Sequence, residues 1–240
     1  MIMTGKWLDM LEVNTVSVSY GKSRIVNRVS FGVESNEKLA ILGRNGVGKT
    51  TLLKSIIGLL PVQTGTISLG NVNLTKMKAY ERACSGIAYV PQGREIFPNL
   101  TVKENLELGA LAHTNKVRER MEEVFDYFPI LPEHLLRKGG VLSGGQQQQL
   151  AIARALMSHP KALLLDEPTE GIQPNVVAEI GNILKRIHKA MQIPIVIVEQ
   201  NLKFAKKLVD RFVVIQKGEI VAGGIADELT DEISHRYLTV

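Results

Sequence analysis

Residues Gly43 to Thr50 read Gly-Arg-Asn-Gly-Val-Gly-Lys-Thr and match the phosphate-binding pattern G-x-x-x-x-G-K-[ST] at every fixed position. Glycines leave room for the backbone to wrap around a polyphosphate, and the loop N–H groups and the next helix N-terminus supply positive field. We expect Lys49 to reach the β- and γ-phosphates and the Thr50 hydroxyl to bind Mg²⁺. The predicted nucleotide contacts are Gly43, Arg44, Asn45, Gly46, Val47, Gly48, Lys49, Thr50 and Thr51.

A pair of acids follows a short apolar segment later in the chain. Leu163–Leu165 precedes Asp166 and Glu167. A carboxylate at the C-terminal end of a buried parallel strand points into the ligand crevice, so Asp166 suits Mg²⁺. Glu167 is then placed to polarise an attacking water. The alternative, two solvated acids that cap a strand, gives no account of the phosphate-binding loop upstream.

The segment Leu142-Ser143-Gly144-Gly145-Gln146 opens a predicted helix. A Ser hydroxyl and free N–H groups at a helix N-terminus form a candidate second anion site, although an ordinary N-cap explains the same residues equally well. The run Gln147–Gln149 that follows is interpreted as a polar helix face without chemistry.

The sequence around these residues predicts the elements that position them. Lys38–Leu42 is a short strand pattern that runs into the Gly-rich loop, and Lys49–Gly58 is a helix pattern with a glycine stop. Strand, loop and helix in this order are the context that a phosphate-binding loop requires. Before them, Leu11–Tyr20 and Ile25–Val33 are rich in residues typical of strands.

The C-terminal part alternates between strand and helix patterns, which predicts a largely parallel sheet. Residues from Gly93 to about Pro160 have mainly helical patterns, and Ser143–Met157 belongs to this stretch. The alternating elements are the strands Ala162–Leu165, Ile195–Val198 and Phe212–Gln216 and the helices Val176–Met191 and Leu202–Leu208.

We therefore predict an α/β fold: a P-loop NTPase core with an antiparallel β layer and a helical insert. One domain is expected over residues 10–240, with a helical subdomain at about 93–160 and an N-terminal extension at residues 1–9. A length of 240 residues suits a single α/β domain with such an insert.

The composition excludes several classes of function. The formal net charge is +5, but only 5% of residues are aromatic, so nucleic acid is not expected as a partner. The single cysteine, Cys84, excludes disulfides and Cys-based zinc sites within one chain, and we expect it to be buried. No apolar run reaches the ~18 residues that a membrane-spanning helix needs.

Five segments, in this order along the chain, resemble those of the ATP-binding subunit of an ABC (ATP-binding cassette) transporter. They are the phosphate loop, Gln92, Leu142–Gln146, Leu163–Glu167 and Glu199-Gln200. Three further segments resemble the branched-chain amino acid uptake class, and more narrowly its urea and short-chain amide members: Pro91–Pro98, Asp166–Pro174 and Val198–Asn201. The resemblance covers residues 11 to about 226, so the implied fold is an ABC ATPase.

The resemblance implies roles for residues that carry little signal alone. Tyr20 stands where the family places an aromatic side chain that stacks on adenine. Gln92 stands where a Gln contacts Mg²⁺ or water and communicates with the membrane subunit. Residues Ser143, Gly144, Gly145 and Gln146 become the ABC signature, which meets the γ-phosphate of ATP held by the opposite subunit.

Two positions depart from the general family pattern. Gln200 occupies the position of a His that contacts the γ-phosphate in most ABC ATPases, and Gln173 replaces the usual Asp after Pro168. A Gln side chain donates a hydrogen bond to phosphate but cannot become cationic. We expect Glu167 and Gln200 to be the catalytic residues.

The implied function is ATP hydrolysis, with ATP and Mg²⁺, that powers uptake of urea or short-chain amides; branched-chain amino acid import is the alternative. The implied partners are a second, non-identical ABC ATPase subunit, two membrane permeases and an external solute-binding protein, with this chain on the cytoplasmic face of the plasma membrane. A soluble P-loop kinase leaves Leu142–Gln146 unexplained. A non-transport ABC protein usually carries tandem cassettes or a long coiled-coil insert.

Overall fold

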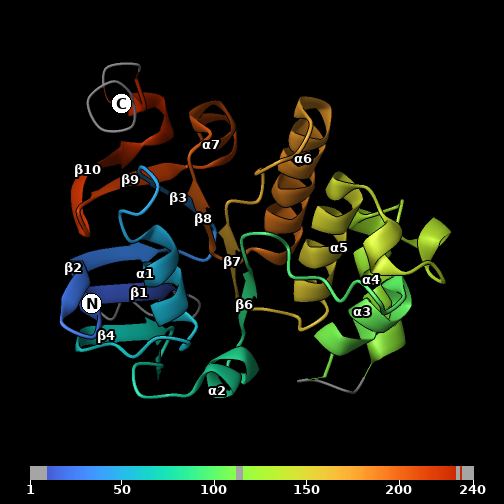
Figure 1. The fold of residues 1–240 in the computed structure, drawn as a ribbon, viewed down its shortest axis with the longest axis horizontal. Helices are drawn as coiled ribbons and strands as arrows, with labels where there is room; N and C mark the ends of the chain where they lie inside the picture. Colours follow the sequence, from blue (N-terminus) through green and yellow to red (C-terminus); the bar gives the residue numbers. More distant parts are fainter. Residues whose placement is uncertain (1–9, 112–115, 231–232, 234–240) are drawn as a thin grey trace, which may run out of the picture.

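A six-stranded sheet runs through the middle of the molecule in the order β10-β9-β3-β8-β7-β6 (Figure 1). The computed structural model describes residues 10–111, 116–230 and 233, so the predicted extension at residues 1–9 lies outside the described residues. The strands of the sheet are β3 (Lys38–Leu42), β6 (Ile87–Val90), β7 (Ala162–Asp166), β8 (Ile195–Glu199), β9 (Arg211–Gln216) and β10 (Glu219–Ile225).

All neighbours in this sheet are parallel except β9 and β10, which confirms the predicted, largely parallel sheet. Successive side chains of a strand point to opposite faces. On β7, Leu163 and Leu165 enter one hydrophobic cluster, whereas Ala162 and Leu164 enter a second one on the other face. Because both faces are covered, β7 has an unbroken apolar sequence before Asp166.

A second sheet is antiparallel, has the order β2-β1-β4-β5 and forms the predicted antiparallel layer. Gly21, with φ +57°, lies in the turn between β1 and β2. The helix α1 (Lys49–Ile56) packs with both sheets, since Leu52 and Leu53 share a cluster with Val13 of β1 and Ile41 of β3. The strands of this sheet are β1 (Leu11–Tyr20), β2 (Ser23–Val33), β4 (Thr64–Leu69) and β5 (Val72–Asn73).

The predicted helical stretch contains α3, α4 and α5, which lie together with α6 on the side of the central strands away from the antiparallel sheet (Figure 1). The remaining helices are short or flank the C-terminal strands. The helices that follow α1 are α2 (Ala79–Cys84), α3 (Val102–Gly109), α4 (Val117–Tyr127), α5 (Gly144–Leu156), α6 (Pro174–Met191) and α7 (Leu202–Leu208). Short 3₁₀ turns lie at Pro132–His134, Gly139–Val141 and Ala226–Glu228.

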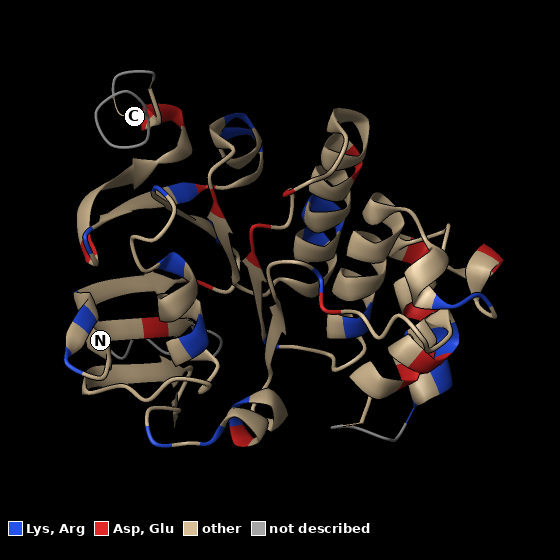
Figure 2. Cartoon of the chain, in the orientation of Figure 1, with Lys and Arg blue, Asp and Glu red and all other residues tan. Residues whose placement is uncertain are grey.

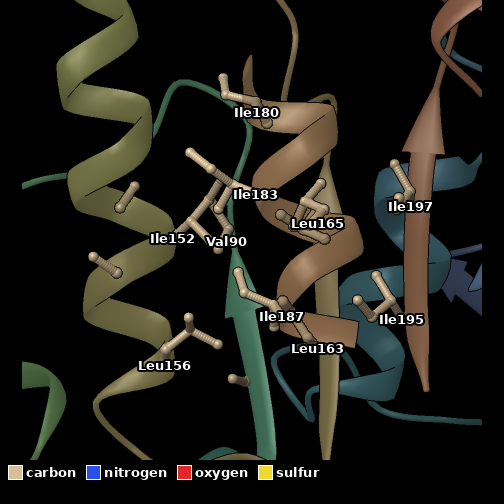
Figure 3. Packing of buried hydrophobic residues seen from close by; sticks show 14 of the residues in the cluster. Val90, Ile152, Leu156, Leu163, Leu165, Ile180, Ile183, Ile187, Ile195 and Ile197 are labelled. Atoms are coloured by element: carbon tan, nitrogen blue, oxygen red, sulfur yellow. The ribbon is translucent and has the colours of Figure 1, made fainter. Parts of the chain in front are cut away.

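The larger hydrophobic cluster joins α5 and α6 to the sheet. Figure 3 shows Ile180, Ile183 and Ile187 of α6 pointing towards Ile152 of α5 and the strand residues around Leu165. The spacing of three and four residues on α6 places these side chains on one helix face. The burial of this face fixes α5 and α6 against β7, whose C-terminal end carries Asp166.

Two expectations about individual side chains are wrong. Cys84 is exposed, because it lies in the last turn of α2, whose only buried residue is Arg82. The run Gln147–Gln149 is not a polar surface, since Gln148 and Gln149 are both buried. With Gln146 the run has four consecutive residues, which cover a full helical turn, so part of it must face inwards when the helix is packed on several sides.

Candidate functional site

The loop between β3 and α1 bends around a cavity of about 270 Å³. Gly48 precedes α1 with φ +107°, and a Cβ there would lie 2.8 Å from the carbonyl oxygen of Ile25. Glycine is therefore required for both the backbone angle and the close approach. The cavity is lined by Ile25, Asn45, Gly46, Gly48, Lys49, Thr50, Thr51, Gln92 and Glu167, all but Ile25 being predicted site residues.

The Lys49 side chain is 4% exposed, and its ammonium group lies inside the loop. Nζ donates hydrogen bonds to the carbonyl oxygens of Gly43 at 2.8 Å and Arg44 at 2.9 Å. It also lies 3.6 Å from Oε1 of Glu167. Burial lowers the pKa of Lys49, and the Glu167 carboxylate opposes this change. The cavity thus has one buried cation held between loop carbonyls and an acid.

Asp166 ends β7 and is almost completely buried. Its Oδ1 accepts a hydrogen bond from the Thr50 hydroxyl at 3.2 Å, and its Oδ2 accepts one from the Tyr89 hydroxyl at 3.1 Å. Burial raises the pKa of Asp166, and the bonds from Thr50 and Tyr89 counteract the rise. Burial also raises the pKa of Tyr89, which therefore stays a donor. These contacts tie the strand end to the phosphate loop.

Glu167 follows with a left-handed backbone, φ +48°. Such a conformation costs a residue other than glycine about 1–3 kcal/mol and persists where the surroundings fix it. Here its N–H donates to the carbonyl oxygen of Val198 at 2.9 Å. The Gln200 amide donates from Nε2 to Glu167 Oε2 at 2.7 Å. The structure therefore brings both predicted catalytic residues together at the ends of β7 and β8, where Figure 2 shows acidic residues.

The two residues assigned by resemblance alone differ in position. Gln92 lines the cavity, and its Nε2 donates to Glu170 Oε2 at 3.0 Å. Tyr20 ends β1, is 50% exposed and is not among the residues that line the cavity. The stacking role of Tyr20 therefore stays a prediction, whereas Gln92 and Glu167 both line the cavity.

Comparison with known proteins places these residues in a family. The sequence profile described as ABC transporter matches residues 26–170, which include the phosphate loop, the Ser143 segment and Glu167. The chain belongs to the ABC transporter family. It has the ABC ATPase fold and is an ATP-binding, ATP-hydrolysing cassette.

Relatives in two organisms carry related names. The cassette is 38% identical over 213 residues, 88% of this chain and 91% of the relative, to the "High-affinity branched-chain amino acid transport ATP-binding protein BraG" of Pseudomonas aeruginosa. It is 35% identical over 223 residues, 92% of this chain and 94% of the relative, to the "Probable branched-chain amino acid transport ATP-binding protein LivF" of Archaeoglobus fulgidus.

Solved structures agree with this assignment. The cassette superposes with a TM-score of 0.79 and 26% identity on the dimeric structure of a post-hydrolysis state of an ATP-binding cassette bound to ADP and Pi, covering 90% of this chain and 98% of that chain. In the described part of our cassette, no helix combines the length and the apolar character needed to cross a membrane.

The segment Leu142–Gln146 caps α5. Ser143 Oγ accepts a hydrogen bond from the N–H of Gln146 at 3.3 Å, and Gln146 Oε1 accepts one from the N–H of Ser143 at 2.9 Å. A Cβ on Gly145 would lie 2.5 Å from Cγ1 of Val176, so the close packing of α5 on α6 requires glycine there. Among the described residues, none of 142–146 lines the cavity at the phosphate loop.

The sequence predicts no individual role for three further residues of the cassette site. Ile25 reaches the cavity from β2, Tyr89 holds Asp166, and Glu199 holds the loops behind Glu167. Tyr89 lies two residues before the segment Pro91–Pro98, and Glu199 belongs to the segment Val198–Asn201; this closeness to segments that carry the resemblance is the one signal that points to them. Ile25 has none, because its place follows from the pairing of β2 with β1.

Proposed function

We propose that this ABC ATPase is the energy-supplying subunit of an importer of branched-chain amino acids or closely similar solutes. The observation that carries this proposal is that Glu167, which lines the phosphate-loop cavity, contacts both Lys49 and Gln200. An acid held in this way beside the phosphate loop is suited to hydrolysis. The solute class rests on the names of the BraG and LivF relatives. Neither name mentions urea or amides, so the expectation of those solutes is without support.

In this proposal the phosphate loop and Lys49 bind the β- and γ-phosphates of ATP, and Glu167 takes the proton of the attacking water. Glu167 is suited to this role because it is an acid at the cavity edge, oriented by the amide of Gln200. Gln200 is also proposed to donate a hydrogen bond from its uncharged amide to the phosphate. Tyr20 is proposed to stack on the adenine, and the signature residues 143–146 to contact ATP of a second cassette.

The residues near Thr50 fit Mg²⁺. The Thr50 hydroxyl and the Asp166 carboxylate converge within 3.2 Å, and Mg²⁺ takes oxygen ligands. Thr50, Asp166 and Gln92 would hold the ion, which when bound neutralises charge on the phosphates. The Tyr89 hydrogen bond keeps the second oxygen of Asp166 in a fixed direction.

The solute is tested by deleting the gene for this chain in its host and restoring it. We expect uptake of labelled leucine to be lost in the deletion strain and recovered with the parental chain, but not with the Glu167→Gln variant. Labelled urea is measured in the same strains. Unchanged leucine uptake together with lost urea uptake would reinstate the urea and amide assignment.

A groove beside the loop after Gln92 is proposed as the contact with a permease. A cavity of about 330 Å³ is lined by Phe97, Leu111, Tyr89 and Arg154, among others. Phe97 is 47% exposed, and the guanidinium carbon of Arg154 lies 5.1 Å from its ring centroid. Ile96, which is also expected in this contact, is partly buried and packs on the core, so Phe97 carries the prediction.

Phe97→Asp is expected to abolish solute uptake while basal ATP hydrolysis stays near the parental rate. A carboxylate in an apolar contact cannot be solvated once a permease helix covers it. The measurement is uptake and ATPase activity of the reconstituted transporter. Val221→Asp is the matched control, because Val221 is a partly exposed apolar residue on β10, at the opposite edge of the sheet from β6. Intact uptake with Phe97→Asp in a folded complex would contradict the docking site.

We also propose that two cassettes assemble to form the working ATPase. The signature segment does not line the cavity of its own chain, and the solved relative that binds ADP and Pi is dimeric. We propose a second, non-identical cassette, two permeases and an external solute-binding protein as partners, on the cytoplasmic face of the membrane. The isolated chain should then be mainly monomeric and a poor ATPase. Light scattering and turnover measurements test this, and full stimulated-level hydrolysis by a monomer would refute it.

A further inference from the structure

Glu199 has a buried carboxylate with four hydrogen-bond donors, although it does not line the nucleotide cavity. Its Oε1 accepts from the Thr169 hydroxyl at 2.7 Å and from the Thr169 N–H at 3.2 Å. Its Oε2 accepts from the N–H groups of Gln200 and Asn201, both at 3.1 Å. An ionised carboxylate has about four lone-pair positions, so the donors match its full accepting capacity.

The donors come from two different loops, and each loop carries one residue of the Glu167–Gln200 contact. Thr169 belongs to the loop after β7, in which the N–H of Glu170 donates to the carbonyl oxygen of Glu167 at 3.1 Å. Gln200 opens the loop after β8. The parallel pairing of β7 with β8 sets the two loops side by side, with Asp166 opposite Val198. Glu199 is therefore bonded to both ends of this contact.

We propose that Glu199 is a positioning residue that clamps the loop after β7 to the loop after β8 and so holds the Gln200 amide on Glu167. The inference rests on the proposed catalytic roles of Glu167 and Gln200. Glu199 contacts neither the cavity nor either of these side chains. It acts through the backbone of Gln200 and through Thr169.

The clamp requires the ionised form of Glu199. Burial raises the pKa of this carboxyl, and the donors from Thr169, Asn201 and Gln200 oppose the rise. Three of the four donors are backbone N–H groups, which cannot accept a hydrogen bond. The Thr169 hydroxyl can turn to accept one, but the Thr169 N–H approaches the same oxygen, so a carboxyl proton or an added NH₂ group opposes at least one N–H in either orientation. Glu199→Gln has nearly the same shape but sets its NH₂ against the donors of one loop or the other. One loop must then separate from residue 199.

The test uses the assembled transporter with the partner cassette's own site disabled. We expect Glu199→Gln to lower kcat about tenfold while KM for ATP stays within about threefold. The reason is that the contact between Gln200 and Glu167 serves the hydrolysis step and not the binding of ATP. The matched control is Glu37→Gln, which also breaks a partly buried carboxylate contact, with Arg211 at 2.8 Å, outside these loops. It should leave both constants unchanged. A kcat for Glu199→Gln within twofold of the parent overturns the inference.

A double-mutant cycle separates positioning from general stability. Gln200→Ala removes the same contact, so it should also lower kcat about tenfold, and the double variant with Glu199→Gln should stay near this tenfold loss. A loss near a hundredfold, the product of the two single losses, would show that Glu199 acts independently and would overturn the clamp. If Glu199→Gln does not fold, Thr169→Val replaces it in the same cycle: a loss of about threefold, coupled to Gln200, is expected, and a parental kcat overturns the inference.

Glu167→Gln in the same assay separates this inference from the proposed function. Parental hydrolysis in Glu167→Gln would remove the proposed catalytic role itself. Loss of hydrolysis in Glu167→Gln together with normal hydrolysis in Glu199→Gln would leave the function standing and remove only the clamp.

Discussion

Replacing Glu167 by Gln is expected to leave ATP binding intact and to lower single-turnover hydrolysis by about 10²–10⁴-fold, the contribution typical of a general base. The amide keeps the shape of the side chain but cannot take a proton from water. The variant should also favour the ATP-bound dimer, since ATP is bound but not cleaved. The measurement is single-turnover hydrolysis in the assembled transporter, with the partner cassette's site disabled.

Gln200 variants provide the comparison for this prediction. Gln200→Ala removes the hydrogen bond that Gln200 donates to Glu167 but keeps the carboxylate that takes the proton, so it should be much less severe than Glu167→Gln. Gln200→His should be tolerated, because an imidazole can donate to the same oxygen. Hydrolysis by Glu167→Gln at the parental rate would exclude Glu167 as the base. A Gln200→Ala variant as inactive as Glu167→Gln would make Gln200 a primary catalytic residue.

Lys49→Ala is expected to weaken ATP binding and to abolish turnover. Lys49 is the buried cation that lines the cavity, and it forms an ion pair with Glu167. The variant removes this positive charge, so the carboxylates leave the site with a net negative charge. A triphosphate is then repelled by the acids that remain. Nucleotide titration and steady-state hydrolysis measure the two effects.

Lys54→Ala is the control for the Lys49 variant. Lys54 lies on the same helix, in the last turn of α1, and does not line the cavity. It should bind and hydrolyse ATP as the parent does. Thermal unfolding of both variants shows whether the helix is intact. Unchanged ATP affinity and hydrolysis in a folded Lys49→Ala variant would disprove the assignment of the phosphate loop.

Much of the framework follows from local sequence patterns. The strands Leu11–Tyr20 and Lys38–Leu42 and the helix Leu202–Leu208 are predicted with their observed bounds, and other predicted elements differ by a few residues at their ends. Short or edge elements are missing from the prediction. β6 has four residues, β5 has two, and β10 contains Gly223 and Gly224, so none of them has a strand-like pattern of useful length.

The candidate site likewise has a part that local sequence patterns predict and a part that they do not. Residues of the phosphate loop are recognisable because their spacing is fixed by the local geometry of one turn. The left-handed backbone of Glu167 and the two donors that Thr169 supplies to Glu199 depend on pairs of residues that are distant in sequence and meet only through the pairing of β7 with β8. A single sequence has no local pattern for such contacts, so they required the structure.

The pairing of β3 also bears on when the site can form. Lys38 of β3 lies opposite Ile195 of β8, and Leu39 lies opposite Arg211 of β9. Both neighbours of this strand are therefore made long after the strand itself has left the ribosome. Until then β3 exposes two unpaired edges, and contacts between such distant segments form slowly. The segment that is easiest to recognise in the sequence is among the last to acquire its working surroundings during synthesis.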